Sequence, residues 1–438
     1  MNWKALNTLP VPVISAKGSI RSPHGAAAVL SVKRAFVWAG FGDAFYAACQ
    51  WGLLVVLARL GTPEMVGQFS LAFAITAPVV ICANLSLRPL QSTDARHQFQ
   101  FKDYLVLRLT SITLALLIIS VLAFQYPTDT ALTIAVLGVG KCFESISDLF
   151  YGLLQKHERM DLIATSLFLK GLASVAGFVA GFMLLGTVLG GVVGLAMAWL
   201  LILVAYDIQK GTQILSRTMD NRHADQTWKL TQTWALCTLA LPLGIGVALL
   251  SLNANIPRYF IERYWGAGAL GQFASMAYIA VAAGMIVNSL GQAMSPRLSQ
   301  HWASGAFGAF RTLLLKFMVL AGLWGLIGVG VAFVAGSSLM TLLYGTEYAN
   351  HADTFVWIMG AAAVSHLASV YGYGMTAARI IRSQFVQFAV VAAIGIIAAI
   401  SLVPSHGLNG AAWAFGASLL AQLVMGAFYL HYSLSCRN

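Results

Sequence analysis

The sequence predicts an all-α polytopic membrane protein with about 12 transmembrane helices in two pseudo-symmetric six-helix lobes. Three observations support this fold class: the composition, the spacing of the apolar runs and an internal repeat. Of the 438 residues, 59% are hydrophobic and only 9% are charged, whereas a soluble domain has roughly 25% charged residues. The formal net charge of +11 is explained by loop lysines and arginines that set membrane topology, so it predicts no nucleic-acid partner.

The chain contains twelve apolar runs, each close to the roughly 20 residues that span a bilayer as a helix. No segment between them is large enough for a soluble catalytic domain. The runs lie at about 35–58, 67–87, 103–124, 130–154, 162–184, 187–206, 232–254, 270–294, 311–335, 353–374, 384–403 and 408–431. They divide the chain into a cytoplasmic leader (1–34), an N-terminal lobe (35–206), a cytoplasmic linker (207–231), a C-terminal lobe (232–431) and a cytoplasmic tail (432–438).

The distribution of basic residues predicts the orientation. If the chain starts inside, 21 of the 26 lysines and arginines fall in cytoplasmic segments or at the cytoplasmic helix ends, and 3 fall outside. Positively charged loops stay on the cytoplasmic side. We therefore expect a multi-pass protein of the bacterial cytoplasmic (inner) membrane with both termini in the cytoplasm.

Short sequence motifs recur in the same order in the two halves. Because each half has an even number of spans, such a duplication predicts parallel repeats related by an axis along the membrane normal. The matching pairs are Gly67-Gln68-Phe69 with Gly271-Gln272-Phe273, Tyr151-Gly152 with Tyr371-Gly372, and Leu189-Gly190-Gly191 with Leu408-Asn409-Gly410.

Ionisable residues inside the spans are costly and predict the functional region. Lys141, Glu144 and Asp148 lie in one spanning run, and their spacing places all three on one helical face. Such a face should contact protein or a water-filled cavity rather than lipid. Glu144 and Asp148 are one turn apart, which makes them candidates for taking up protons.

The first span repeats this pattern. Asp43, Tyr46 and Gln50 have the spacing of the charged face on the fourth span, and Lys170 lies deep in the fifth span. We expect the Asp43 face to line the same lobe interior, within a water-bridged distance of Lys141 or Asp148. Two interpretations remain open: a cavity wall that contacts a charged substrate or carries protons, and an internal salt-bridge network that fixes helix packing.

The second lobe has almost no buried charge. Its first span contains Pro242, Gly244 and Gly246, a combination that favours a kink, although a tolerated proline in a packed bundle is an equal alternative. His366 is more typical of a hydrogen-bonded interior residue than of a ligand. The sequence has no metal-ligand spacing and no P-loop, so we expect neither a bound metal nor ATP hydrolysis.

Three stretches resemble the Wzx-type polysaccharide flippases, which share a superfamily with the MATE exporters and the lipid II flippase. These stretches are ARLGTPEMVGQFSLAFAI, DLFYGLLQKHERMD and NANIPRYFIERYWGAGALGQFASMAYI. The resemblance implies alternating access that carries an undecaprenyl-diphosphate-linked oligosaccharide, such as an O-antigen, capsule or exopolysaccharide repeat unit, to the outer leaflet. It further implies that a cationic cavity receives the diphosphate, with Lys141, Lys170 and Arg258 as the matching positions. The acids on the same face depart from that pattern.

The resemblance also implies the partners: the lipid-linked glycan, membrane lipid and polysaccharide polymerase or assembly proteins. It implies no cofactor and no enzymatic activity, with H⁺ or Na⁺ as the candidate coupling ion. The main alternative is a MATE-like exporter of small cationic compounds, in which Asp43, Glu144 and Asp148 would bind the ion or drug. A membrane glycan polymerase or ligase is disfavoured because the outer loops are short, and the loop RPLQSTDARHQFQFKD lacks the pattern of a major-facilitator porter.

Overall fold

The computed structural model describes residues 32–94, 98–218 and 230–435. Most of the predicted leader, the middle of the predicted linker and the last three residues of the predicted tail lie outside these ranges. The described residues are almost entirely helical and contain no strand. Their helices are α1 (Val32–Leu60), α2 (Pro63–Asn84), α3 (Leu87–Thr93), α4 (Phe101–Ala123), α5 (Thr128–Lys156), α6 (Met160–Leu185), α7 (Val188–Ile202), η1 (Leu203–Asp207), α8 (Ile208–Thr218), α9 (Leu230–Ala303), α10 (Phe307–Tyr344), η2 (Thr346–His351), α11 (Ala352–Ala377) and α12 (Ile381–Ser435).

The predicted twelve membrane crossings are confirmed. Within the described ranges, ten helical segments are long and apolar enough to cross a bilayer. Two of them, α9 and α12, contain a glycine outside helical geometry, Gly266 (φ 79°) and Gly407 (φ 57°). Glycine adopts such positive φ values at little cost. The chain therefore reverses direction at both positions, and each of these long helices provides two crossings.

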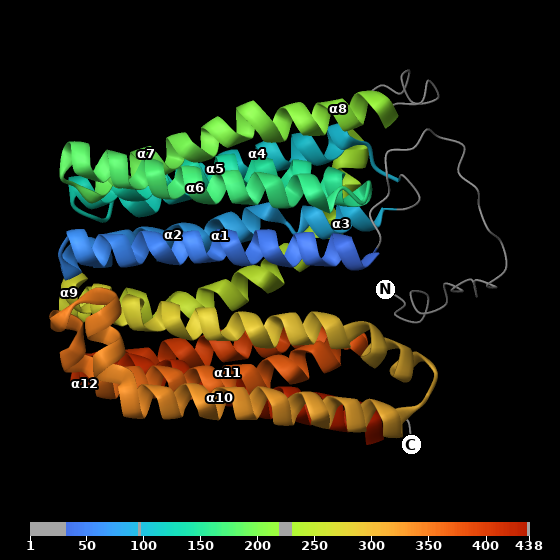
Figure 1. Ribbon diagram of the computed structural model, residues 1–438. Helices are drawn as coiled ribbons and strands as arrows, with labels where there is room; N and C mark the ends of the chain where they lie inside the picture. The colour runs from blue at the N-terminus through green and yellow to red at the C-terminus, as the bar shows by residue number, and fades with distance from the viewer. Residues whose placement is uncertain (1–31, 95–97, 219–229, 436–438) are drawn as a thin grey trace.

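The helices form two bundles that lie side by side (Figure 1). Helices α1 to α8 make up the N-terminal lobe, whereas most of α9 together with α10, α11 and α12 makes up the C-terminal lobe. Helix α1 begins and α12 ends at the same end of the bundles, which we call the terminal end. The opposite end, where Gly266 and Gly407 lie, is the distal end. The even number of crossings accounts for this arrangement.

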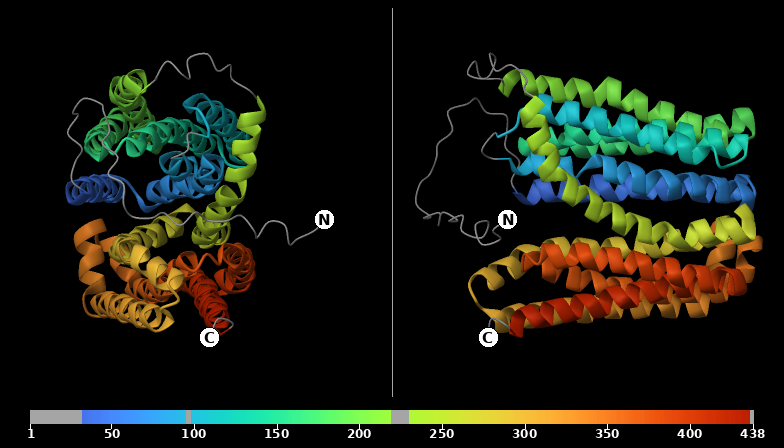
Figure 2. Two further views of the ribbon diagram at one scale, coloured as in Figure 1. Left: turned by 90° about the vertical axis from the view of Figure 1, so that its right-hand side faces the viewer. Right: turned by 180° about the vertical axis from the view of Figure 1, so that it is seen from behind.

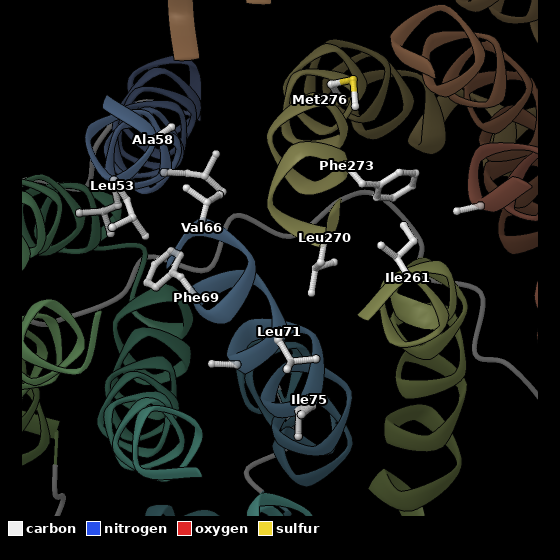
Figure 3. Packing of buried hydrophobic residues seen from close by; sticks show 14 of the residues in the cluster. Leu53, Ala58, Val66, Phe69, Leu71, Ile75, Ile261, Leu270, Phe273 and Met276 are labelled. Atoms are coloured by element: carbon white, nitrogen blue, oxygen red, sulfur yellow. The ribbon is translucent and has the colours of Figure 1, made fainter. Parts of the chain in front are cut away.

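At the distal end the two lobes share one hydrophobic core. Side chains of α1 and α2, including Leu53 and Phe69, belong to the same buried cluster as Leu270 and Phe273 of α9 (Figure 3). The Trp51 indole also donates a 2.9 Å hydrogen bond to the Tyr344 hydroxyl across the lobes. Burial of continuous apolar surface stabilises this end.

The repeated Gly-Gln-Phe motifs meet at this contact. A Cβ placed on Gly67 would overlap the carbonyl group of Ala267, and one placed on Gly271 would overlap the carbonyl group of Pro63. Each glycine thus faces the residue four positions before its counterpart in the other lobe. This reciprocal contact relates the two halves by pseudo-symmetry, and it requires glycine because the two backbones approach so closely.

At the terminal end the lobes have separate cores. The cluster formed by Phe310, Leu314 and Phe317 contains only C-terminal-lobe residues. The cluster formed by Tyr151, Leu154 and related side chains contains only N-terminal-lobe residues. The lobes are therefore packed together distally, and near the terminal end they are packed independently except at the first turns of α9.

Helix α9 connects the lobes at the terminal end. Its first turns pack on the N-terminal lobe, where Leu236 and Ala240 join a cluster with Leu87 and Tyr104. The helix then runs obliquely into the C-terminal lobe (Figure 2). Pro242 lies inside this segment, yet the non-helical backbone angles of α9 are at Gly266. Pro242 therefore does not interrupt the helix, and a kink at this position stays a prediction.

Candidate functional site

The charged face of α5 points into the N-terminal lobe. The Lys141 Nζ atom lies 2.7 Å from Glu144 Oε2, and the Tyr46 hydroxyl of α1 donates a 2.7 Å hydrogen bond to Glu144 Oε1. The side chains of Lys141 and Glu144 are 19% and 27% exposed. The structure thus brings together three residues that the sequence predicted from spacing alone.

Aromatic rings surround the Lys141 ammonium group. Its Nζ lies 5.0 Å from the ring centre of Phe73 on α2 and 4.9 Å from that of Trp199 on α7. The electron-rich faces of aromatic rings attract cations at such distances. The ammonium group is therefore held by one carboxylate and two rings, and it remains partly accessible.

The Asp148 carboxylate accepts hydrogen bonds from two arginines. Its Oδ1 lies 3.4 Å from Nη1 of Arg88, and its Oδ2 lies 3.3 Å from Nη2 of Arg108, whose side chain is fully buried. Arg108 also donates to Asn84 Oδ1. A buried guanidinium is costly unless it is both paired and hydrogen-bonded. These partners satisfy the two Nη atoms of Arg108, whereas its Nε has no hydrogen-bond partner in the part of the chain that the structure describes.

The break between α2 and α3 precedes Arg88. Leu85 (φ 52°) and Ser86 (φ 50°) both adopt left-handed backbone conformations that are uncommon for residues other than glycine. After this break, Arg88 donates a 3.1 Å hydrogen bond to Gln155 Oε1 as well as contacting Asp148. Unusual backbone geometry is thus located where a partly exposed arginine meets the charged face of α5.

Lys170 forms a third group inside the lobe. It is 1% exposed, and its Nζ donates to the Tyr151 hydroxyl at 2.9 Å and to Asp207 Oδ2 at 3.3 Å. Ser166 connects Tyr151 and Asp207. Its hydroxyl oxygen lies 2.7 Å from the Tyr151 hydroxyl oxygen, and it donates a hydrogen bond to Asp207 Oδ1. In this conformation Lys170 is enclosed by its partners and does not reach a ligand-accessible surface.

Asp43 and Gln50, the remaining predicted residues of α1, do not join this network directly. Asp43 is exposed, and it forms no ion pair with another described residue, although it interacts electrostatically with Arg88. The Gln50 Nε2 atom is buried and has no hydrogen-bond partner within the described ranges. The expected approach of Asp43 to Lys141 or Asp148 therefore stays a prediction.

Sequence reasoning missed the partners of two predicted residues. Arg88 and Arg108 were assigned to cytoplasmic helix ends, and Asp207 was assigned to the linker, yet they pair with Asp148 and Lys170. Asp207 directly follows an apolar run, which was the signal available. Its position in the short π-helical segment η1 turns it toward α6, and that local geometry has no clear sequence signature.

Arg258, the predicted site residue of the C-terminal lobe, differs from the others. Its Nη1 donates a 3.0 Å hydrogen bond to Asn255 Oδ1, and its guanidinium lies 5.7 Å from the centre of the Tyr278 ring. It forms no ion pair with any described residue. Together with Asn253, His366 and Gln422 it lines a cavity of about 360 Å³ between α9, α11 and α12. No group of His, Cys, Asp or Glu in the described ranges is arranged to hold a metal.

Comparison with protein families gives a match that covers more than half of the chain. The model of a family described as polysaccharide biosynthesis protein matches residues 44–302. The capsular polysaccharide biosynthesis protein CapF of Staphylococcus aureus is 27% identical over 305 residues, which cover 70% of this chain and 75% of CapF.

Solved structures with the same fold are transport proteins. The lipid II flippase MurJ in an inward closed conformation superposes with a TM-score of 0.70 at 13% identity, over 91% of this chain and 87% of MurJ. An inward-facing multidrug resistance MATE transporter of the MOP superfamily superposes with a TM-score of 0.63 at 13% identity, over 92% of this chain and 95% of the transporter. The predicted two-lobe fold is confirmed by these likenesses.

Proposed function

Because the chain belongs to the polysaccharide biosynthesis protein family, we propose that it is a flippase for an undecaprenyl-diphosphate-linked oligosaccharide. It would carry this lipid across the bacterial cytoplasmic membrane by alternating access, without covalent chemistry. The observation that supports the mechanism best is the uneven contact between the lobes, which share a core distally and have separate cores at the terminal end. The basic-residue bias supports a cytoplasmic location for the terminal end.

A diphosphate headgroup needs fixed cations in place of its hydration water. Lys141 and Arg88, at 19% and 30% side-chain exposure, are the paired cations at the charged face of α5 that a ligand can approach without unfolding the lobe. We assign them as diphosphate anchors, whereas Lys170 maintains the lobe through Asp207. When the anchors turn to the diphosphate, Glu144 keeps only the Tyr46 hydroxyl and Asp148 keeps only Arg108. Proton uptake by those acids would then couple substrate binding to ion movement.

The test is surface-glycan complementation in a strain that lacks the chain, at matched protein levels. We expect Lys141→Ala to fail and Lys141→Arg to restore part of the glycan, because arginine keeps the positive charge. Wild-type glycan with Lys141→Ala would contradict the anchor role. If a combined Lys141→Ala/Glu144→Ala variant restores surface glycan, the ion pair serves helix packing instead, because removal of both partners leaves no unpaired charge.

A MATE-like exporter of small cations is the second candidate. It is favoured by one observation, the exposed Asp43 carboxylate that lacks an ion-pair partner among the described residues. Such a carboxylate can accept a cation or a proton. Ion-dependent efflux of a cationic dye that persists in cells without the glycan pathway would support this candidate, whereas loss of surface glycan on deletion supports the flippase.

A further inference from the structure

The C-terminal-lobe cavity collects buried polar atoms that the protein itself leaves without partners. Four such atoms belong to residues that line it: Asn253 Oδ1, Arg258 Nε, His366 Nδ1 and Gln422 Oε1. Asn253, His366 and Gln422 are 3%, 5% and 9% exposed. Buried polar groups are nearly always hydrogen-bonded in folded proteins. Four unpartnered groups around one cavity therefore indicate that something else occupies it.

The chemistry of the lining disfavours a metal ion or an organic cation. None of the residues that line the cavity is an Asp or a Glu, and the one charged group is a guanidinium. Amide, imidazole, guanidinium and hydroxyl groups provide both donors and acceptors. Ser365 and Ser369 add hydroxyl groups to the same wall. A ligand with several hydroxyl groups and apolar C–H faces matches such a lining, because apolar side chains such as Phe273 and Leu419 form the rest of the wall.

The size and position of the cavity suit part of a larger substrate. Its volume of about 360 Å³ is at the small end of the range of ligand pockets, which is roughly 300–1,000 Å³. A second cavity of about 390 Å³ shares Asn288, Ser369 and Gln422 with it and continues toward Tyr373 and Gln384. A row of amide and hydroxyl groups thus extends from one cavity into the next.

The Arg258 end of the cavity adjoins the contact between the lobes. Tyr259, the next residue along α9, donates a hydrogen bond to the backbone carbonyl of Ala74 on α2. A group held near Arg258 is therefore close to the surface that has to separate during alternating access.

We propose that this cavity binds a sugar ring of the transported glycan, with its hydroxyl groups bonded to Asn253, His366 and Gln422 and an acceptor oxygen bonded to Arg258. This inference rests on the proposed flippase function. The two lobes then bind different parts of the substrate: the N-terminal lobe binds the diphosphate, and the C-terminal lobe binds the sugar.

Apolar substitutions separate this role from a structural one. Replacing a buried polar atom that has no partner by an apolar group of similar shape is neutral or stabilising for the fold. We expect Asn253→Leu and Gln422→Leu to leave the thermal unfolding temperature of the purified full chain unchanged or higher. Surface glycan should nevertheless fall by about tenfold or more, which corresponds to one lost hydrogen-bonding interaction of about 1.4 kcal/mol.

Gln91→Leu is the matched control. Gln91 is also a buried amide, 2% exposed, and its Oε1 has no hydrogen-bond partner in the part of the chain that the structure describes. It lies on α3, away from the cavity, so its substitution should leave surface glycan at the wild-type level. Wild-type glycan in both cavity variants would overturn the proposal and would mean that the cavity holds only water.

Thiol protection identifies the bound group. A Ser365→Cys variant, in a chain whose five native cysteines are replaced by alanine, is treated with a small thiol reagent. We expect protection by lipid-linked oligosaccharide extracted from the host and none by undecaprenyl diphosphate without sugar. Equal protection by both lipids, or by neither, would overturn the proposal. The flippase function itself fails separately, if deletion of the chain leaves surface glycan intact.

Discussion

The two lobes have related folds but differ in how their buried charges are paired. All six ion pairs found within the described ranges lie in the N-terminal lobe, and the buried cations Arg108 and Lys170 each meet a carboxylate there. In the C-terminal lobe, Arg258 has no carboxylate, and several buried amide and imidazole atoms have no partner within the described part of the chain. Duplication of one six-helix unit has thus produced one lobe with compensated charges and one with an uncompensated polar cavity.

This difference separates stability from binding. A buried charge that loses its partner is strongly destabilising, so the paired groups of the N-terminal lobe tolerate little change. An unpartnered polar group costs stability in the folded state, and sites of this kind persist where function requires them. The comparison therefore predicts large stability effects in one lobe and functional effects without stability loss in the other.

The largest effect is expected at Lys170. Lys170→Met would leave the buried Asp207 carboxylate without its cation, and we expect the free energy of unfolding to fall by about 3–5 kcal/mol. Lys170→Met/Asp207→Asn should recover much of this loss, because no unpaired charge remains and the amide can still accept from Ser166. Chemical or thermal unfolding in detergent measures both variants.

Arg258→Met provides the contrast in the C-terminal lobe. This substitution removes one hydrogen bond to Asn255 and leaves no carboxylate unpaired. We therefore expect the free energy of unfolding to fall by about 1 kcal/mol or less. A loss as large as that of Lys170→Met would show that the C-terminal lobe depends on Arg258 as much as the N-terminal lobe depends on Lys170.

The second prediction concerns the contact that joins the lobes. Gly67→Ala and Gly271→Ala each place a methyl group against a backbone carbonyl of the other lobe, a steric conflict of about 1–3 kcal/mol. Because the contact is reciprocal, we expect both variants to open the distal end to a similar degree. A cysteine at Ala58, which is 8% exposed in the shared core, should then react about tenfold faster with a membrane-impermeant thiol reagent.

Two other glycines serve as controls for this experiment. A Cβ at Gly52 or Gly360 meets no atom within 4 Å, so alanine at either position should leave the reaction rate unchanged. If Gly67→Ala reacts no faster than Gly52→Ala, the glycine contact does not hold the distal end closed.

The fold was predictable because it follows from patterns that are local in the sequence. Apolar runs gave the crossings, and the repeated Gly-Gln-Phe motif indicated the duplication that the structure shows as a reciprocal contact. The spacing of Lys141 and Glu144 gave one ion pair, since residues three apart on a helix are neighbours.

The rest of the site depends on contacts between distant segments. The pairing of Lys170 with Asp207 joins residues 37 positions apart, and that of Arg108 with Asp148 spans 40 positions. No periodicity of a single helix predicts such contacts. The polar cavity was missed for the same reason, because Asn253, His366 and Gln422 come from three helices and none of them is charged.

The smallest stability effect is expected at Asp43, which tests whether an acid without an ion-pair partner behaves differently from a paired one. Asp43 is exposed and forms no ion pair with a described residue, so Asp43→Asn should change the free energy of unfolding by no more than about 0.5 kcal/mol. Asp148→Asn is the matched substitution within the paired network. It removes the carboxylate that faces the fully buried Arg108, and we expect a clearly larger loss.

Surface-glycan complementation completes this last comparison. If Asp43 accepts the coupling proton or ion, Asp43→Asn should reduce glycan display although the protein remains as stable as the wild type. Asp43→Glu, which keeps the carboxylate, should restore part of it. Wild-type display with Asp43→Asn would exclude Asp43 from coupling and leave Glu144 and Asp148 as the acids that can take up protons. A stability loss equal to that of Asp148→Asn would instead place Asp43 within the compensated network of the N-terminal lobe.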